Sequence, residues 1–190
     1  MIVIGYGTGR CGTQSLASFL NQQEGFNITH EKVPKYWCPQ FSEREEVPDI
    51  FAGREEKVIG DIGFYWIHYI PNMLKRSDTK VINIIRNDDE VIESFWTYKS
   101  PDSVNLGGWF GYPYQNEKPT KDAIAKTVRS YRRCEKEYKK KFPNTIYQMD
   151  ITDLNSEDKL HNLLTWLDVD CKRNMTIKHI DIKRIKGELK

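Results

Sequence analysis

The chain has 190 residues, of which 38% are hydrophobic, and its formal net charge at pH 7 is only +2. This length is enough for one compact domain with a sizeable core, so we expect a single domain over residues 1–190. The small net charge argues against a nucleic-acid-binding protein, and no apolar stretch approaches the roughly 18–20 residues that a membrane span needs.

The first predicted element is a strand near residues 2–6, which opens with the apolar run Ile2-Val3-Ile4. Because this strand runs directly into a glycine-rich loop, the N-terminus does not look like a signal peptide. We therefore expect a soluble, cytoplasmic protein.

The loop at residues 7–12 (GTGRCG) joins this strand to a predicted helix near residues 14–23. Backbone N–H groups in such a loop and the helix dipole favour a bound anion. The two outer glycines have the spacing of a nucleoside-triphosphate loop, but Thr13 stands where that loop has its lysine, and the positive charge is on Arg10. The sequence predicts a phosphate- or sulfate-binding loop; the alternative is a tight turn that holds no ligand.

The rest of the chain continues the alternation of strands and helices. Further strands are predicted near residues 26–30, 57–61, 80–86 and 144–149, and further helices near residues 64–76, 89–99, 120–141 and 157–167. This order indicates an α/β fold of three layers, with a central, mostly parallel sheet flanked by helices. Ligands of such sheets bind at the carboxyl ends of the strands, so the first loop, Glu31, Asp61 and Arg86 are expected to share one crevice.

A second candidate anion site follows the strand near residues 80–86. Arg86 ends that strand, and Ser94 lies about two turns into the next predicted helix. An arginine and a serine so spaced can converge on one phosphate through charge-assisted hydrogen bonds. Taken alone, the pair also fits a capped surface helix.

These segments resemble motifs of the sulfotransferases that use 3′-phosphoadenosine 5′-phosphosulfate (PAPS). Residues 7–16 (GTGRCGTQSL) are similar to the loop that binds the 5′-phosphosulfate, and Arg86 with Ser94 is similar to the 3′-phosphate motif. The second motif departs from the family pattern at Asp88, which replaces a proline, and at Glu90, where a basic residue is common.

The resemblance extends to the C-terminal third of the chain. A strand near residues 144–149 is followed by Asp153-Leu154 and by a helix that ends in Trp166-Leu167, the order that these sulfotransferases have. The resemblance implies a P-loop-NTPase-like sulfotransferase fold. It also implies transfer of a sulfuryl group from PAPS, without a metal, to a hydroxyl or amine of a small-molecule, glycan or peptide acceptor.

The resemblance also implies which residues bind the donor. In the first loop and the helix start they are Gly9, Arg10, Cys11, Gly12, Thr13, Gln14 and Ser15, and in the second motif Arg86 and Ser94. Lys186 is a further candidate, because Arg184-Ile185-Lys186-Gly187 is similar, with one extra residue, to a segment that closes the 3′-phosphate site in family members.

Sulfuryl transfer needs a cation where charge builds on the bridging oxygen and a base that takes the acceptor proton. Arg10 is the candidate cation. Glu31, which follows the second strand, is the first candidate for the base, and His30 either orients it or acts itself. His68 is the next candidate and Asp61 the third.

Two other functions stay open at this point. A P-loop kinase or hydrolase would need a magnesium-binding acid, for which Asp61 is a candidate, and a loop lysine, which is missing. A non-catalytic nucleotide-binding relic is the other. The four cysteines contain no C-x-x-C pair, so neither a metal site nor a disulfide framework is expected, although Cys11 lies at a helix N-terminus, which favours a lowered thiol pKa.

Overall fold

The computed structural model describes residues 1–32, 50–97 and 120–168. Its strands are β1 (Ile2–Tyr6), β2 (Phe26–His30), β3 (Val58–Ile62), β4 (Thr79–Ile85) and β5 (Ile146–Asp150). Its α-helices are α1 (Thr13–Leu20), α2 (Ile70–Met73), α3 (Asp88–Thr97), α5 (Lys121–Lys141) and α6 (Glu157–Leu167). Two 3-10 helices, η2 (Phe64–His68) and η4 (Ile151–Asn155), complete the elements.

The five strands form one parallel sheet in the order β2-β3-β1-β4-β5. This arrangement confirms the predicted α/β fold. In the register of the central strand, Ile4 lies opposite Asp61 on β3 and opposite Val81 on β4. All strands therefore end at the same edge of the sheet, where the loop after β1 and the residues after β2, β3 and β4 also lie.

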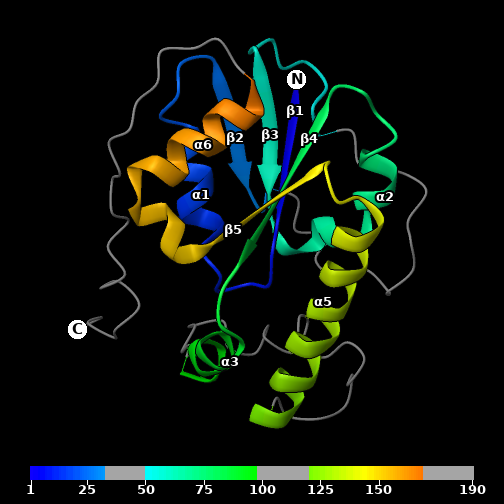
Figure 1. Ribbon diagram of the computed structural model, residues 1–190, viewed down its shortest axis with the longest axis vertical. Coiled ribbons are helices and arrows are strands. Elements are labelled where there is room, and N and C mark those ends of the chain that lie inside the picture. Colours follow the sequence, from blue (N-terminus) through cyan, green and yellow to red (C-terminus); the bar gives the residue numbers. More distant parts are fainter. Residues whose placement is uncertain (33–49, 98–119, 169–190) are drawn as a thin grey trace.

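Helices cover both faces of the sheet (Figure 1), and all five residues of β1 are buried. Val3 belongs to a buried cluster with α1 and α6, whereas Ile2, Ile4 and Tyr6 belong to a second cluster with η2, α2 and Tyr131 of α5. Because both faces are covered, the central strand β1 has no charged residue, as is usual for buried parallel strands.

Helix α3 lies beyond the carboxyl edge of the sheet, below the end of β4 in Figure 1. Its apolar residues Val91, Ile92 and Phe95 pack with Ile124 and Val128 of α5 and form a third buried cluster. The strand-to-helix connection after β4 therefore places α3 beside the first loop, where Ser94 contacts Arg10.

One predicted element differs from the structure. The helix expected near residues 64–76 consists of η2 and the short α2, with Tyr69 between them. The N–H of Tyr69 donates to the carbonyl of Trp66, a 3-10 hydrogen bond. Pro71 has no N–H for a bond to the preceding turn, so a continuous α-helix cannot run through it.

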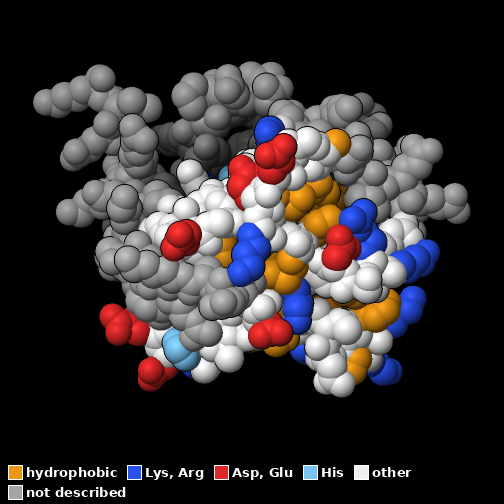
Figure 2. All heavy atoms as spheres, turned by 90° about the horizontal axis from the view of Figure 1, so that it is seen from above, with side chains coloured by type: hydrophobic (Ala, Val, Ile, Leu, Met, Phe, Trp, Pro, Cys, Tyr) orange, Lys and Arg blue, Asp and Glu red, His pale blue; other side chains and the backbone are white. Residues whose placement is uncertain are grey.

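The charge of the molecule is mixed at the amino end of the sheet. Seen from that end (Figure 2), Lys and Arg side chains of the described residues are interspersed with Asp and Glu side chains and with apolar ones. Among the residues that the structure describes, no helix combines the length and the apolar character of a membrane span.

Candidate functional site

The first loop approaches the neighbouring strand closely, and this approach requires glycine. A Cβ on Gly7 would lie 2.2 Å from the carbonyl oxygen of Ile84 on β4. Gly12 has a φ of 95° and precedes α1, where its carbonyl accepts the first helical hydrogen bond from Leu16. The backbone thus turns from β1 into a helix N-terminus, whose first N–H groups have no partner within the helix, an arrangement that favours anion binding.

Arg10 joins the two predicted phosphate motifs. Its Nε donates to Oγ of Ser94 at 3.1 Å, and its carbonyl oxygen accepts from Nη1 of Arg86 at 3.1 Å. These partners are 84 and 76 residues away along the chain. The fold therefore brings Arg10, Arg86 and Ser94 into direct contact at the carboxyl edge of the sheet.

Glu90 moderates the positive charge of this group. Its Oε2 accepts from Nε of Arg86 at 2.8 Å across one turn of α3, and its side chain is 58% exposed. An exposed ion pair of this kind contributes little stability. Glu90 therefore orients the Arg86 guanidinium, and breaking this ion pair would cost little free energy.

Sequence reasoning missed a buried arginine that supports this region. Arg132 of α5 donates to the carbonyl of Arg86, to Asp88 and to Glu135. A signal was present in the sequence, because Arg132 and Glu135 fall within the stripe of α5 residues that also contains Val128 and Tyr131. Charged residues in an otherwise buried helix stripe indicate a paired, structural role.

The candidate bases His30 and Glu31 lie at the end of β2, on the opposite side of β1 from β4 and Arg86. Oγ1 of Thr13 and Nε2 of His30 are hydrogen-bonded at 3.1 Å, and Nε2 of His30 is 4.0 Å from Oε1 of Glu31. Burial raises the pKa of Glu31 to about 7, and the negative charge of Asp61 adds to this shift. Burial lowers the pKa of His30, although Asp61 opposes the shift. The pair thus combines a carboxyl group that titrates near neutrality with an imidazole that favours its neutral form.

Asp61, the third candidate base, is held by protein donors. It is fully buried and accepts from Oγ1 of Thr29 at 2.5 Å, from Nε1 of Trp66 at 2.8 Å and from the hydroxyl of Tyr65. The N–H of Lys32 also points to it at 3.4 Å. Because donors occupy both carboxylate oxygens, Asp61 organises the ends of β2, β3 and η2.

The structure locates the remaining predicted residues as follows. His68 ends η2 and is half-buried. The histidine that contacts Thr13 of the loop is His30. Gln14 is exposed and Ser15 half-buried in the first turn of α1, and Gly9 lies in the preceding loop. Lys186 lies outside the described residues.

The expectation of a lowered pKa for Cys11 is wrong. Its thiol is fully buried, and burial raises the thiol pKa to about 12. The Cβ position of Gly7 lies only 2.6 Å from Sγ of Cys11, so the side chain points into the interior beneath the loop. The thiol therefore does not contribute to the surface of the loop.

Neither a known protein family nor a curated protein sequence matches this chain. Among solved structures, it is similar to a sulfotransferase from Alicyclobacillus acidocaldarius, with a TM-score of 0.62 and 16% identity over 93% of this chain and 85% of that one. It is also similar to mouse sulfotransferase SULT7A1 complexed with PAP, with a TM-score of 0.54 and 14% identity over 90% of this chain. The alignment spans 60% of the mouse protein. The fold of this chain is therefore the one that sulfotransferases have.

Proposed function

We propose that this protein is a sulfotransferase that moves a sulfuryl group from PAPS to a hydroxyl or amine of a small-molecule, glycan or peptide acceptor. The observation that carries the proposal is the contact of Arg10 with both Ser94 and Arg86. Two cationic side chains and a hydroxyl thereby gather beside a helix N-terminus, which suits a ligand with two separate anionic groups.

The residues fit this donor. The loop over residues 9–12 and the first turn of α1, with Thr13, Gln14 and Ser15, would hold the 5′-phosphosulfate through backbone N–H and hydroxyl groups. Arg86 and Ser94 would hold the 3′-phosphate. The close approach of Gly7 to Ile84 supports this assignment, because it fixes the path of the loop backbone against β4.

The donor supplies an activated sulfur whose bond to the 5′-phosphate oxygen breaks as the acceptor oxygen or nitrogen bonds to it. Arg10 stabilises the charge that develops on the bridging oxygen. Glu31 takes the acceptor proton, and His30, which is fixed by Thr13, orients the carboxylate. The products are the sulfated acceptor and 3′-phosphoadenosine 5′-phosphate (PAP).

A P-loop kinase or hydrolase is the less suitable alternative. Its loop lysine is replaced by Thr13, and Asp61, the candidate magnesium ligand, already accepts hydrogen bonds from Thr29, Tyr65 and Trp66. A non-catalytic relic would keep the donor site and lack turnover, so the test includes both binding and turnover.

The test is calorimetric titration with PAP, with ATP plus Mg²⁺ and with 5′-AMP. We expect PAP to bind with selective micromolar affinity, and Arg86→Ala to weaken it about tenfold to a hundredfold through the loss of a charge-assisted contact. Arg133→Ala, which removes an exposed arginine of α5, is the control and should leave the affinity unchanged. Tighter binding of ATP, or no binding of PAP, would refute the proposal. PAP binding without sulfuryl transfer to any of a panel of acceptors would favour the non-catalytic nucleotide-binding relic over the enzyme.

A further inference from the structure

Arg132 is a charged residue in a place that normally excludes charge. It lies on the inner face of α5, only 9% exposed, beside the buried residues Val128 and Tyr131. A buried guanidinium is costly unless it is paired and hydrogen-bonded. Its partners therefore indicate which part of the molecule the arginine stabilises.

Three donors of Arg132 are engaged by three different groups. Nη2 donates to the carbonyl oxygen of Arg86 at 2.5 Å, Nε donates to Oδ1 of Asp88 at 2.7 Å, and Nη1 donates to Oε2 of Glu135 at 2.7 Å. Glu135 lies on the same helix and is itself buried, so it orients the guanidinium. The other two contacts reach out of α5 to the connection between β4 and α3.

This connection determines where the second motif points. Arg86 directly follows β4, Asp88 is the first residue of α3, and Ser94 lies further along the same helix. Between them, the side chain of Asn87 caps α3 by accepting from the N–H groups of Asp89 and Glu90. Holding the Arg86 carbonyl and the Asp88 carboxylate together fixes the angle at which α3 leaves the strand.

We propose that Arg132 is a positioning residue for the 3′-phosphate site. It acts through the Arg86 carbonyl and Asp88, and it holds Arg86 and Ser94 against Arg10 before the donor binds. The inference rests on the proposed function, because the group that the site would hold is the donor's 3′-phosphate.

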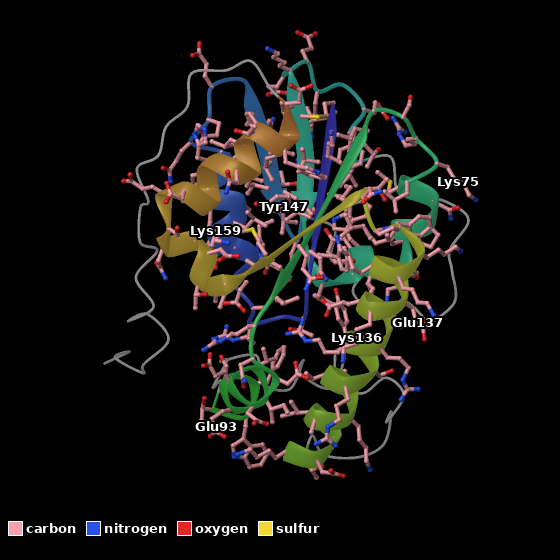
Figure 3. The ribbon with its side chains drawn as sticks, viewed as in Figure 1. Lys75, Glu93, Lys136, Glu137, Tyr147 and Lys159 are labelled. Carbon is pink, nitrogen blue, oxygen red and sulfur yellow. The ribbon has the colours of Figure 1, made fainter. Side chains whose placement is uncertain are left out.

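A second ion pair between α3 and α5 provides a matched control. Lys121 at the start of α5 pairs with Glu93 of α3, and both side chains are more than half exposed. Figure 3 shows Glu93 on α3, beyond the carboxyl edge of the sheet. This pair links the same two helices, but it does not contact the connection that follows β4.

The first variants are Asp88→Ala and Lys121→Ala. The Asp88 side chain is 45% exposed, so its removal leaves the buried Arg132–Glu135 pair in place and the protein folded. We expect Asp88→Ala to weaken PAP binding about tenfold, as the loss of one charge-assisted bond allows. Lys121→Ala should change it less than twofold. The affinity for 5′-AMP, which has no 3′-phosphate, should stay within twofold in both.

A proline at position 88 tests the same idea by another route. Position 88 is the first residue of α3, where proline fixes a helical φ and its missing N–H costs no hydrogen bond. Asp88→Pro should therefore keep PAP affinity within about threefold of wild type, because covalent rigidity replaces the ion pair. Arg132→Gln should weaken PAP binding at least tenfold, and adding Asp88→Pro should recover most of that loss.

A merely structural role predicts a different pattern. General loosening of α5 would weaken 5′-AMP as much as PAP, and proline would not restore binding. That pattern, or unchanged PAP affinity in both Asp88→Ala and Arg132→Gln, would overturn the inference. Failure of the wild-type protein to bind PAP refutes the proposed function itself, whereas wild-type binding that only Arg86→Ala abolishes refutes the positioning role alone.

Discussion

Two of the candidate catalytic residues adopt a backbone conformation that L-amino acids avoid. Arg10 has a φ of 67° and Glu31 a φ of 46°. A non-glycine residue in this region costs about 1–2 kcal/mol, and such residues cluster at functional sites. Each is held by its surroundings, since Arg10 binds Ser94 and Arg86, and the N–H of Glu31 donates to the carbonyl of Ile62. The third such residue among the described ones, Asp168, has a φ of 56° and caps the C-terminus of α6, whereas Arg10 and Glu31 are residues to which the proposed mechanism assigns chemistry.

The raised pKa of Glu31 leads to a pH prediction. A general base must be deprotonated, so a carboxyl group with a pKa of about 7 is mostly inactive below that pH. We expect kcat/KM to rise with pH up to about 7 and then to level off. Glu31→Gln should lower kcat about 10²–10⁴-fold and abolish the rising limb.

Two further variants separate Glu31 from its neighbours. Asp61 raises the pKa of Glu31, so Asp61→Asn should move the rising limb to lower pH. Burial lowers the pKa of His30 from its usual 6.5, so a limb that lies clearly below pH 6.5 and disappears in His30→Asn would identify His30 as the base instead. The measurement is kcat/KM for the acceptor between pH 5.5 and 9, with PAPS saturating.

At the scale of single residues, the sequence could predict contacts that follow from topology. Arg10, Arg86 and Ser94 meet because parallel strands end at one edge, and the alternation of strands and helices predicts a parallel sheet. The order of the strands in that sheet was not predicted. The buried state of Cys11 was not predictable, because it depends on how closely Gly7 packs against β4. A helix N-terminus alone would lower the pKa of the Cys11 thiol, but here the effect of burial, which raises that pKa, is larger.

At the scale of elements, one buried carboxylate joins three of them. Asp61 of β3 accepts from Thr29 of β2 and from Tyr65 and Trp66 of η2. An asparagine at this position keeps the size but offers one acceptor oxygen in place of two, and its NH₂ group faces donors. The elements that carry His30 and Glu31 would then lose their common partner.

We therefore expect Asp61→Asn to lower the free energy of unfolding by roughly 2–4 kcal/mol, since several buried donors are left partly unsatisfied. Urea denaturation followed by circular dichroism measures this change. Asp89→Asn, at an exposed position of α3, is the control and should change it by less than about 0.5 kcal/mol. An effect of Asp61→Asn no larger than that of the control would contradict the role given to Asp61.

Element types were predictable where periodicity and length agree. The long amphipathic α5 begins at the predicted point because Thr120 caps it, accepting from the N–H of Ala123. Residues 64–70 instead form a nearly continuous apolar and aromatic run, which has no clear period. Their division into η2 and α2 depends on packing beneath the sheet, with Trp66 stacked on Phe51 and edge-on to Tyr69.

At the scale of the whole molecule, the described core consists of three buried clusters rather than one. Two of them lie on the faces of the sheet, and the third joins α3 to the first half of α5. Helix α3 thus packs its apolar side on another helix and not on a strand. Its described links to the first loop and to the end of β4 include Ser94 with Arg10 and Glu90 with Arg86, and Asp88 pairs with Arg132 of α5.

The position of α3 relative to the sheet therefore involves polar contacts, whereas its apolar side packs on α5. Local stability varies across a protein with the number of buried contacts and exposed backbone hydrogen bonds. In the ligand-free protein, we expect amides of α3 to exchange with solvent faster than those of β1, which is buried along its whole length. Hydrogen exchange followed by mass spectrometry resolves the two segments.

Donor binding should change this order in a specific way. A 3′-phosphate that bridges Arg86 and Ser94 replaces weak polar links with charge-assisted ones, so PAP should slow exchange in both α3 and the first turn of α1. The nucleotide 5′-AMP should slow exchange only at α1, and Ser94→Ala should reduce the protection of α3 by PAP without altering that of α1. Equal protection of α3 by both nucleotides would mean that the 3′-phosphate does not contact this helix. The polar contacts of α3 would then stabilise the fold without taking part in donor binding.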